Sequence, residues 1–274
     1  MEEITAEYSV ESIAAPIELR VRPKITVGAK TDLGRVRENN EDKHEFYLTE
    51  SDAELASRGH VLIVCDGMGG HAAGQFASEL SVKTFIDVYR SHPAQQPEEA
   101  AQAAVVAANR FVLDVARAIP SRRGMGTTLS ALMIVQDSGI IAHVGDSRIY
   151  RLRDGEITQL TRDHTWVEEM VAMGALSRED AENHQNRHMI LRAIGADLEV
   201  NPDVSRIDLQ EGDIYMLCSD GLTNHVSDEE IQAVLASESP SQAAWTLVGK
   251  ALVGGGSDNT TAIVARIDSL ESLS

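Results

Sequence analysis

Short apolar runs with strand-like alternation recur along the chain, and tight turns separate several of them. Asp-Gly at 154–155 and the turn QDSG at 136–139 each join two such runs, and glycine accepts positive φ without steric cost, so both are strong hairpin signals. The sheets should therefore be mainly antiparallel. The predicted strands are 25–31, 60–65, 128–135, 139–144, 148–153, 156–160, 213–218 and 260–267.

Two longer segments, 72–90 and 98–117, carry apolar residues at helical spacing along one face. Shorter helices fit 228–236 and 241–252. Helices with a single apolar face must cover something, and antiparallel sheets offer the partner. The pattern therefore predicts an α+β fold, a four-layer α-β-β-α sandwich in which helices cover two mainly antiparallel sheets.

Three parts of the chain differ in character. Residues 1–23 form an acidic N-terminal extension that ends near Pro23 and is either a flexible tail or an extra edge strand. Residues 24–270 contain no linker, which indicates one domain. Residues 165–195 are polar and partly helical, as expected of an insertion over one edge of the fold. Its His184 and His188 should be surface residues, because no third ligand accompanies them at a helical spacing.

Composition narrows the classes of function. The chain has 43 acidic and 24 basic residues and a formal charge of −19. This charge argues against a protein that binds nucleic acids or anionic membrane surfaces. No apolar stretch approaches the roughly 20 residues that span a bilayer, and the acidic start has no signal-peptide apolar region. We therefore expect a cytoplasmic protein. Cys65 and Cys218 end apolar runs without a CxxC pair, so both should be buried, inert thiols.

Aspartate follows directly where several apolar strands end. Asp66, Asp146 and Asp220 each come after such a strand, whereas Asp258 stands just before one. Carboxylates from four strand ends can converge on one rim of the sheets, where their mutual repulsion is acceptable only if cations lie between them. Hard oxygen ligands favour Mg²⁺ or Mn²⁺.

Two arginines precede a further acidic pair near the start of the domain. Arg35 and Arg37 stand shortly before Glu41 and Asp42 in the run TDLGRVRENNED. A guanidinium group holds phosphate through two parallel hydrogen bonds, which suits a phosphate site. An arginine beside acidic residues also commonly forms a surface ion pair, so this run alone leaves both interpretations open.

Seven motifs in order give the chain a family resemblance: TDLGRVRENNED, VCDGMGGHAAG, MGTTLSAL, HVGDSRIYRL, LTRDHT, LCSDGL and GGGSDNTTAIV. Over roughly residues 24–268 the chain resembles the PPM/PP2C family of metal-dependent protein phosphatases, bacterial type. The resemblance implies hydrolysis of phosphoserine and phosphothreonine on proteins by a water that two divalent cations, Mn²⁺ or Mg²⁺, activate. It also implies that the insertion at 165–195 is a mobile flap that touches substrate.

The resemblance further implies a metal site built from the strand-end aspartates. Asp66 would bridge both cations, with the carbonyl of Gly67 as a further ligand. Asp220 and Asp258 would complete the first site. Asp146 would hold a third, weaker cation.

Other residues would support this site if the resemblance holds. Asp42, with Glu41 beside it, would hold the second cation through bound waters, and Arg37 would bind the phosphate. Thr127 and Thr128 would be buried hydroxyls that steady the site.

The chain departs from many eukaryotic members at Met68, where they carry the histidine proposed as general acid. Methionine cannot donate a proton. His71, three residues further on, or a metal-bound water could protonate the leaving oxygen, although a histidine at the start of a helix is commonly a capping residue. His164 in the LTRDHT motif should have a structural or flap-anchoring role.

Three other functions compete with a protein phosphatase. A binding module that has lost activity is disfavoured by the intact set of Asp66, Asp220, Asp258 and Arg37. A hydrolase of small phosphate esters would share the metals but needs a pocket for the organic group. A structural Ca²⁺ protein would need a DxDxDG loop that the chain lacks. As partners we expect phosphorylated proteins, in particular a serine/threonine kinase and its substrates, and we expect a monomer.

Overall fold

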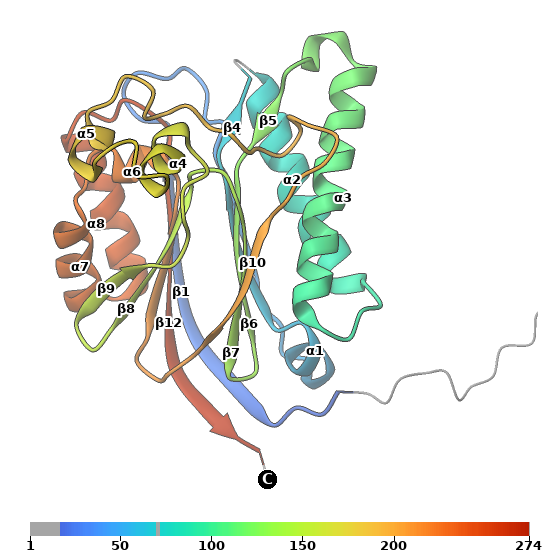
Figure 1. Ribbon diagram of the computed structural model, residues 1–274. Helices are drawn as coiled ribbons and strands as arrows, with labels where there is room; N and C mark the ends of the chain where they lie inside the picture. Colours follow the sequence, from blue (N-terminus) through green and yellow to red (C-terminus); the bar gives the residue numbers. More distant parts are fainter. Residues whose placement is uncertain (1–16, 70–71, 274) are drawn as a thin grey trace, which may run out of the picture.

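Two five-stranded sheets lie face to face in the computed structural model, which describes residues 17–69 and 72–273 (Figure 1). Every strand pairing in them is antiparallel. The first sheet consists, in spatial order, of β1 (Val21–Asp32), β12 (Thr260–Ser272), β11 (Ile214–Cys218), β8 (Arg148–Arg153) and β9 (Glu156–Gln159). The second consists of β10 (Asp203–Asp208), β7 (Ser138–Val144), β6 (Leu129–Val135), β3 (His60–Cys65) and β2 (Lys43–Tyr47).

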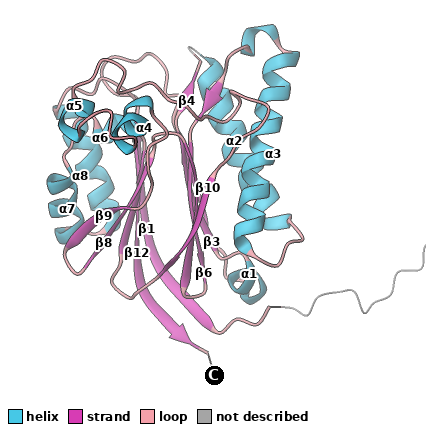
Figure 2. Ribbon diagram, viewed as in Figure 1, coloured by secondary structure: helices cyan, strands magenta, loops and turns pink. Residues whose placement is uncertain are grey.

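Helices cover the outer faces of both sheets, so the predicted α-β-β-α sandwich is confirmed (Figure 2). Helices α7 (Asp228–Ser237) and α8 (Pro240–Val253) lie on the first sheet, and α2 (Ala72–Ser91) and α3 (Pro97–Ala118) on the second. None of the helices in the described ranges combines the length and apolar character of a membrane-spanning segment. The short elements are α1 (Asp52–Ser57), η2 (Pro120–Arg122), α4 (Trp166–Ala172), α5 (Arg178–Glu182), α6 (Asp220–Thr223) and the rim ribbon of β4 (Gly67–Met68) and β5 (Gly126–Thr127).

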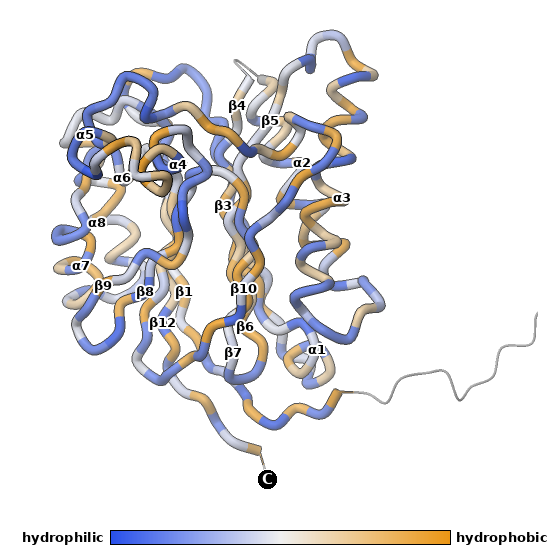
Figure 3. Tube along the Cα trace, viewed as in Figure 1, coloured by the Kyte–Doolittle hydropathy of each residue, from blue (hydrophilic) through white to orange (hydrophobic). Residues whose placement is uncertain are grey.

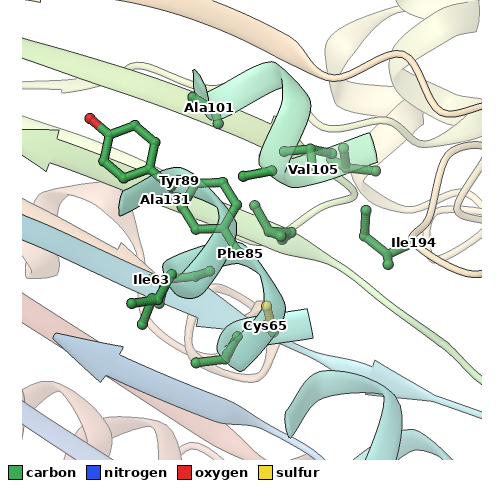
Figure 4. Close-up of a cluster of buried hydrophobic side chains, with 14 of the residues drawn as sticks. Ile63, Cys65, Phe85, Tyr89, Ala101, Val105, Ala131 and Ile194 are labelled. Carbon is green, nitrogen blue, oxygen red and sulfur yellow. The ribbon is translucent and has the colours of Figure 1, made fainter. Parts of the chain in front are cut away.

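Strand β3 shows why its sequence is a continuous apolar run. Val61, Ile63 and Cys65 face α2 and α3, while Leu62 and Val64 point between the two sheets. Both faces of the strand are therefore buried, and each fully buried Val, Leu or Ile stabilises the fold by about 1.5–3 kcal/mol. The cluster under α2 and α3 appears in Figure 4, and Figure 3 shows apolar residues concentrated along the strands.

Both predicted hairpin turns are present. Asp154 and Gly155 have positive φ values of 51° and 81°, as a two-residue type I′ turn requires, and they connect β8 to β9. Gln136 also has a positive φ, of 55°, in the turn that joins β6 to β7. These turns set the register, so that Arg153 pairs with Glu156.

Some elements differ from the predicted pattern. Strands β2 and β10 had no counterpart among the predicted ranges, and β12 runs on to Ser272. Strand β1 begins at Val21, inside the predicted N-terminal extension, because Val21 pairs with Ser272 at the open end of the sheet. The earlier part of the extension, residues 1–16, lies outside the described residues.

Candidate active site

The sheet topology explains why aspartates distant in the sequence meet at one rim. Strands β3 and β7 both pair antiparallel with β6, so they run in the same direction and end at the same edge. Asp66 follows the first of them, and Asp146 comes two residues after the second. Strands β11 and β12 are antiparallel neighbours, so the end of one lies beside the start of the other. Asp220 and Asp258 flank this junction.

A cavity of about 500 Å³ lies at this rim. In the described part of the chain, no three His, Cys, Asp or Glu side chains are close enough together to hold a single ion by themselves. A cation here would take part of its coordination from water, as Mg²⁺ usually does in proteins. Among the residues that line the cavity are eight that the sequence proposed: Arg37, Glu41, Asp66, Gly67, Thr128, Asp146, Asp220 and Asp258.

The surroundings of the Asp66 and Asp146 carboxyl groups disfavour their negatively charged forms. Burial raises the pKa of Asp66 well above its ordinary value, and the negative charges of neighbouring aspartates, first Asp42 and then Asp220, raise it further. Burial also raises the pKa of Asp146, with Asp220 the main neighbouring charge. Such crowding is destabilising unless protons or cations neutralise it, which fits a site built for cations.

Asp220 differs from Asp66 and Asp146 in the direction of its pKa shift. Its Oδ2 accepts a hydrogen bond of 3.1 Å from Asn224 Nδ2 and lies 3.7 Å from His188 Nδ1. Burial raises the pKa of Asp220, but the nearby imidazole and amide outweigh that effect, and the net shift is downward. Asp220 therefore carries its negative charge more readily than Asp66 or Asp146.

Asp42 lies behind the cavity and is only 2% exposed. Its Oδ2 accepts hydrogen bonds of 2.7 Å from Ser219 Oγ and Thr261 Oγ1. Its buried Oδ1 has no hydrogen-bond partner among the described residues. Burial raises the pKa of Asp42 to about 7. A buried, unpartnered carboxylate oxygen beside the cavity suits a contact with a water of a cation's shell.

Two buried threonines hold the backbone of Asp66 in place. Thr128 Oγ1 accepts the Asp66 N–H at 2.8 Å, and the Asp66 carbonyl accepts from the Thr127 hydroxyl and the Thr128 N–H, each at 2.8 Å. The side chain of Asp66 is thereby aimed from a fixed backbone. The structure places both hydroxyls in the supporting role expected of them.

Gly67 sits where no side chain fits. A Cβ on Gly67 would lie 2.2 Å from the carbonyl oxygen of Gly74 in helix α2, and 2.7 Å from the Glu41 carbonyl oxygen. The start of α2 therefore packs directly against the β4 backbone. This close approach brings the Gly67 peptide to the cavity wall, where its carbonyl is available as a ligand.

Arg37 enters the cavity from the loop after β1. Its Nη2 donates to Asp258 Oδ2 at 2.7 Å, and 51% of its side chain is exposed. The hydrogen bond to Asp258 raises the pKa of the guanidinium. Arg37 therefore forms an ion pair, one of the two interpretations that the sequence left open, and this pair lies in the wall of the cavity.

Both cysteines are free and buried. Burial raises the pKa of the Cys65 thiol well above its ordinary value and that of Cys218 to about 12. The thiolate form is therefore scarce at neutral pH, and neither residue is a candidate nucleophile.

The residue proposed as a proton donor, His71, lies outside the described residues. Met68 and Gly69, which precede it in the sequence, line the cavity, with the φ of Gly69 at 129°.

The flap contributes residues that the sequence did not assign to the site. Arg187, His188 and Ile190, from the segment after α5, also line the cavity. His188 is half exposed, as predicted for a surface residue, yet it faces Asp220. The HxxxH spacing of His184 and His188 did not predict this position, because the contact between His188 and Asp220 depends on how the flap folds over the rim.

This fold is shared with solved bacterial protein phosphatases. Residues 35–250 match the family model described as Protein phosphatase 2C, so the chain belongs to that family.

Curated relatives agree with this assignment. The chain is 38% identical over 248 residues to serine/threonine protein phosphatase PstP of Mycobacterium tuberculosis, covering 90% of this chain but 46% of that protein, so it spans about half the relative's length. It is 37% identical to serine/threonine phosphatase stp of Listeria innocua, covering 86% and 93% of the two chains. A crystal structure of the PstP catalytic domain with two manganese ions superposes with a TM-score of 0.77 at 38% identity, covering 89% of this chain and 99% of that one.

Proposed function

We propose that this chain hydrolyses phosphoserine and phosphothreonine monoesters on proteins with the help of divalent cations. The observation that carries the proposal is the cavity itself, where carboxylates from four strand ends gather beside an exposed arginine. The similarity to named serine/threonine phosphatases supports the same activity.

The acidic residues suit two divalent cations, Mn²⁺ or Mg²⁺. Asp66 and the Gly67 carbonyl would hold both ions, Asp220 and Asp258 would hold the first, and Asp42 would contact the second through water. Support comes from the raised pKa values of the buried carboxyls, from the unpartnered Asp42 Oδ1, and from the manganese found in PstP. When bound, the cations supply an activated water and neutralise charge on the phosphoryl group.

Asp146 is proposed to hold a third, weaker cation. It is buried at the cavity wall, where burial and then the negative charge of Asp220 raise its pKa, so a nearby cation would offset its charge.

The protein's own contribution to the reaction is to bind and orient the phosphate. Arg37 can donate two parallel hydrogen bonds to phosphoryl oxygens, and it is half exposed in a cavity whose wall also contains several carboxylates. Its ion pair with Asp258 holds the guanidinium at the entrance before substrate arrives. In the transition state, the same hydrogen bonds stabilise the charge that develops on those oxygens.

The leaving serine or threonine oxygen must gain a proton. We propose His71 as a donor to that oxygen, because it follows closely in sequence after Met68 and Gly69, which line the cavity, with a metal-bound water as the alternative source. Met68 lines the cavity but has no proton to give.

A protein phosphomonoester arises from kinase chemistry, so we propose a serine/threonine kinase and its substrates as the functional partners. We also propose that the chain acts as a monomer in the cytoplasm, consistent with its acidic composition.

A phosphate-release assay with a phosphothreonine peptide tests the activity. We expect Mn²⁺-dependent turnover that EDTA abolishes and that Asp220→Asn lowers by at least about a hundredfold, as is usual when a catalytic metal ligand is lost. Asp87→Asn, a matched change on the exposed face of α2, should leave turnover unaltered. Absence of metal-dependent turnover would favour a non-catalytic binding module, and a strong preference for p-nitrophenyl phosphate would favour a hydrolase of small esters.

A further inference from the structure

One buried histidine joins three elements beside the proposed active site. His164 is only 6% exposed and stands just before the flap helix α4. Its backbone and its ring both contact Gly145, the residue that precedes Asp146: the His164 N–H donates to the Gly145 carbonyl at 2.8 Å, and the Gly145 N–H donates to His164 Nδ1 at 3.1 Å. The loop that carries Asp146 is thus held at two points by one residue.

The same histidine also holds the far end of the flap. The N–H of Leu191 donates to the His164 carbonyl at 2.7 Å, and next to it Thr165 and Ile190 form a bridge. The two ends of the flap, about 25 residues apart in sequence, therefore meet at His164. If the flap opens here, the hydrogen bond between Leu191 and His164 and the bridge between Thr165 and Ile190 must either break or move with it.

The imidazole ring has a defined tautomer. Because Nδ1 accepts from Gly145, the proton of the neutral ring sits on Nε2, which lies 3.2 Å from Asp203 Oδ2 and donates to it. Asp203 begins β10 and also accepts from Arg192, near the C-terminal end of the flap, at 3.3 Å. The ring of His164 therefore connects the Asp146 loop to β10, the strand that follows the flap in the sequence.

A chain of buried polar contacts continues from this point to Asp66. The ring centroids of His143 and His164 lie 4.7 Å apart, and Ser130 Oγ lies 2.9 Å from both His143 Nδ1 and the Ser147 carbonyl. Ser147 Oγ in turn lies 2.7 Å from Thr128 Oγ1, the acceptor of the Asp66 N–H. One ring contact followed by hydrogen bonds thus connects the base of the flap to the central aspartate.

We propose that His164 is a positioning residue that clasps the base of the flap to the loop of Asp146, so that flap and loop keep one relative position. The proposal rests on the proposed phosphatase function for its kinetic consequences, but not for its structural ones. Loss of the clasp would free the flap residues Arg187 and His188, which line the cavity, and would release the backbone that aims Asp146.

Three variants separate the contacts. His164→Ala removes both ring contacts. His164→Asn keeps an acceptor near Nδ1 for the Gly145 N–H but loses the link to Asp203. His60→Asn is the matched control: His60 is 7% exposed and also accepts a backbone N–H at Nδ1, from Thr49 at 3.3 Å, but it begins β3 at the end remote from the cavity.

Hydrogen exchange in metal-free protein tests the clasp directly. For His164→Ala we expect at least about tenfold faster exchange of the flap amides of Trp166 and Leu191, with β6 amides unchanged, because local opening exposes only the segment it frees. His164→Asn should show the same effect in the flap. In a Trp245→Phe background, quenching of Trp166, the remaining tryptophan, should also increase. Wild-type exchange in the flap, or equal acceleration in β6, would overturn the proposal.

Kinetics supply an independent readout. Losing one or two hydrogen bonds should raise the KM for a phosphothreonine peptide, and the Mn²⁺ concentration for half-maximal rate, about threefold to tenfold in His164→Ala. His164→Asn should restore the Mn²⁺ dependence but not KM, and His60→Asn should match the wild type. If kcat alone fell, the positioning role would be wrong. An inactive wild-type chain would refute the phosphatase function, while the exchange experiment would still decide the clasp.

Discussion

Replacement of Asp42 by asparagine should have opposite effects with and without metal. Asparagine has nearly the same shape and keeps an acceptor for Ser219 and Thr261, but it removes the negative charge. Without cations the negative charge of Asp42 destabilises the folded state, since it is fully buried among other carboxylates. With cations bound, the same charge attracts them and stabilises the folded state.

The pKa of Asp42 determines how much its charge destabilises the folded state in the absence of cations. A carboxyl pKa raised from 3.8 to about 7 costs the ionised folded state roughly 4 kcal/mol above pH 7. The cost is absent below about pH 4, where the group is protonated in both states, and it grows as pH rises to 7, because the folded state then binds more protons than the unfolded one. The asparagine NH₂ would replace the unpartnered Oδ1, at a cost of about 1–3 kcal/mol. The net gain should be about 1–3 kcal/mol at pH 8.

Thermal unfolding in EDTA measures this difference. We expect Asp42→Asn to melt higher than the wild type at pH 8, by about 2–4 °C for each kcal/mol, with a smaller difference at pH 5. Added Mn²⁺ should stabilise the wild type more than the variant. As a control, Asp213 is equally buried but accepts from Arg153 Nε and Nη2 at 2.7 and 2.6 Å, so Asp213→Asn should lower the melting temperature. A lower melting temperature for Asp42→Asn in EDTA at pH 8, or an equal gain from Mn²⁺, would refute the reasoning.

Three further substitutions test other parts of the account. Arg37→Lys loses the fork that holds phosphate and should lower kcat/KM for a phosphopeptide about tenfold to a hundredfold in steady-state assays; an unchanged value would place Arg37 outside phosphate binding. His71→Ala should slow phosphopeptide turnover far more than p-nitrophenyl phosphate turnover, whose leaving group needs no proton, and equal effects would remove His71 from the mechanism. Gly67→Ala should lower the free energy of unfolding by more than about 2 kcal/mol in urea melts, because its Cβ would lie 2.2 Å from the Gly74 carbonyl oxygen; wild-type stability would contradict that packing.

The buried elements could be predicted because their buried positions carry mainly apolar residues, which can be read from the sequence. Strand β3 is buried at all six positions and apolar at five of them, 61–65, since both its faces are covered, and the Asp154–Gly155 turn has the composition its positive φ angles demand. Strand β10 was not predictable. It lies at a sheet edge, and only Val204 and Ile207 of its six residues are partly buried, so tertiary pairing with β7 rather than local pattern creates the strand.

The site divides in the same way. The strand-end position of Asp66 and Asp220 is a local feature, so the sequence shows it. The approach of His188 to Asp220 depends on how the flap folds back, and the burial of Asp42 depends on two hydroxyls more than 170 residues away. No local pattern encodes contacts of this kind.

The central claim is that these carboxylates hold paired cations, and anomalous diffraction at the manganese edge tests it most directly. Crystals of this chain grown with Mn²⁺ should show two strong anomalous peaks in the cavity, both within about 2.5 Å of carboxylate oxygens, with Asp66 between them. Two peaks there would support the account. A cavity without anomalous signal at saturating Mn²⁺, or manganese bound only elsewhere on the acidic surface, would contradict it.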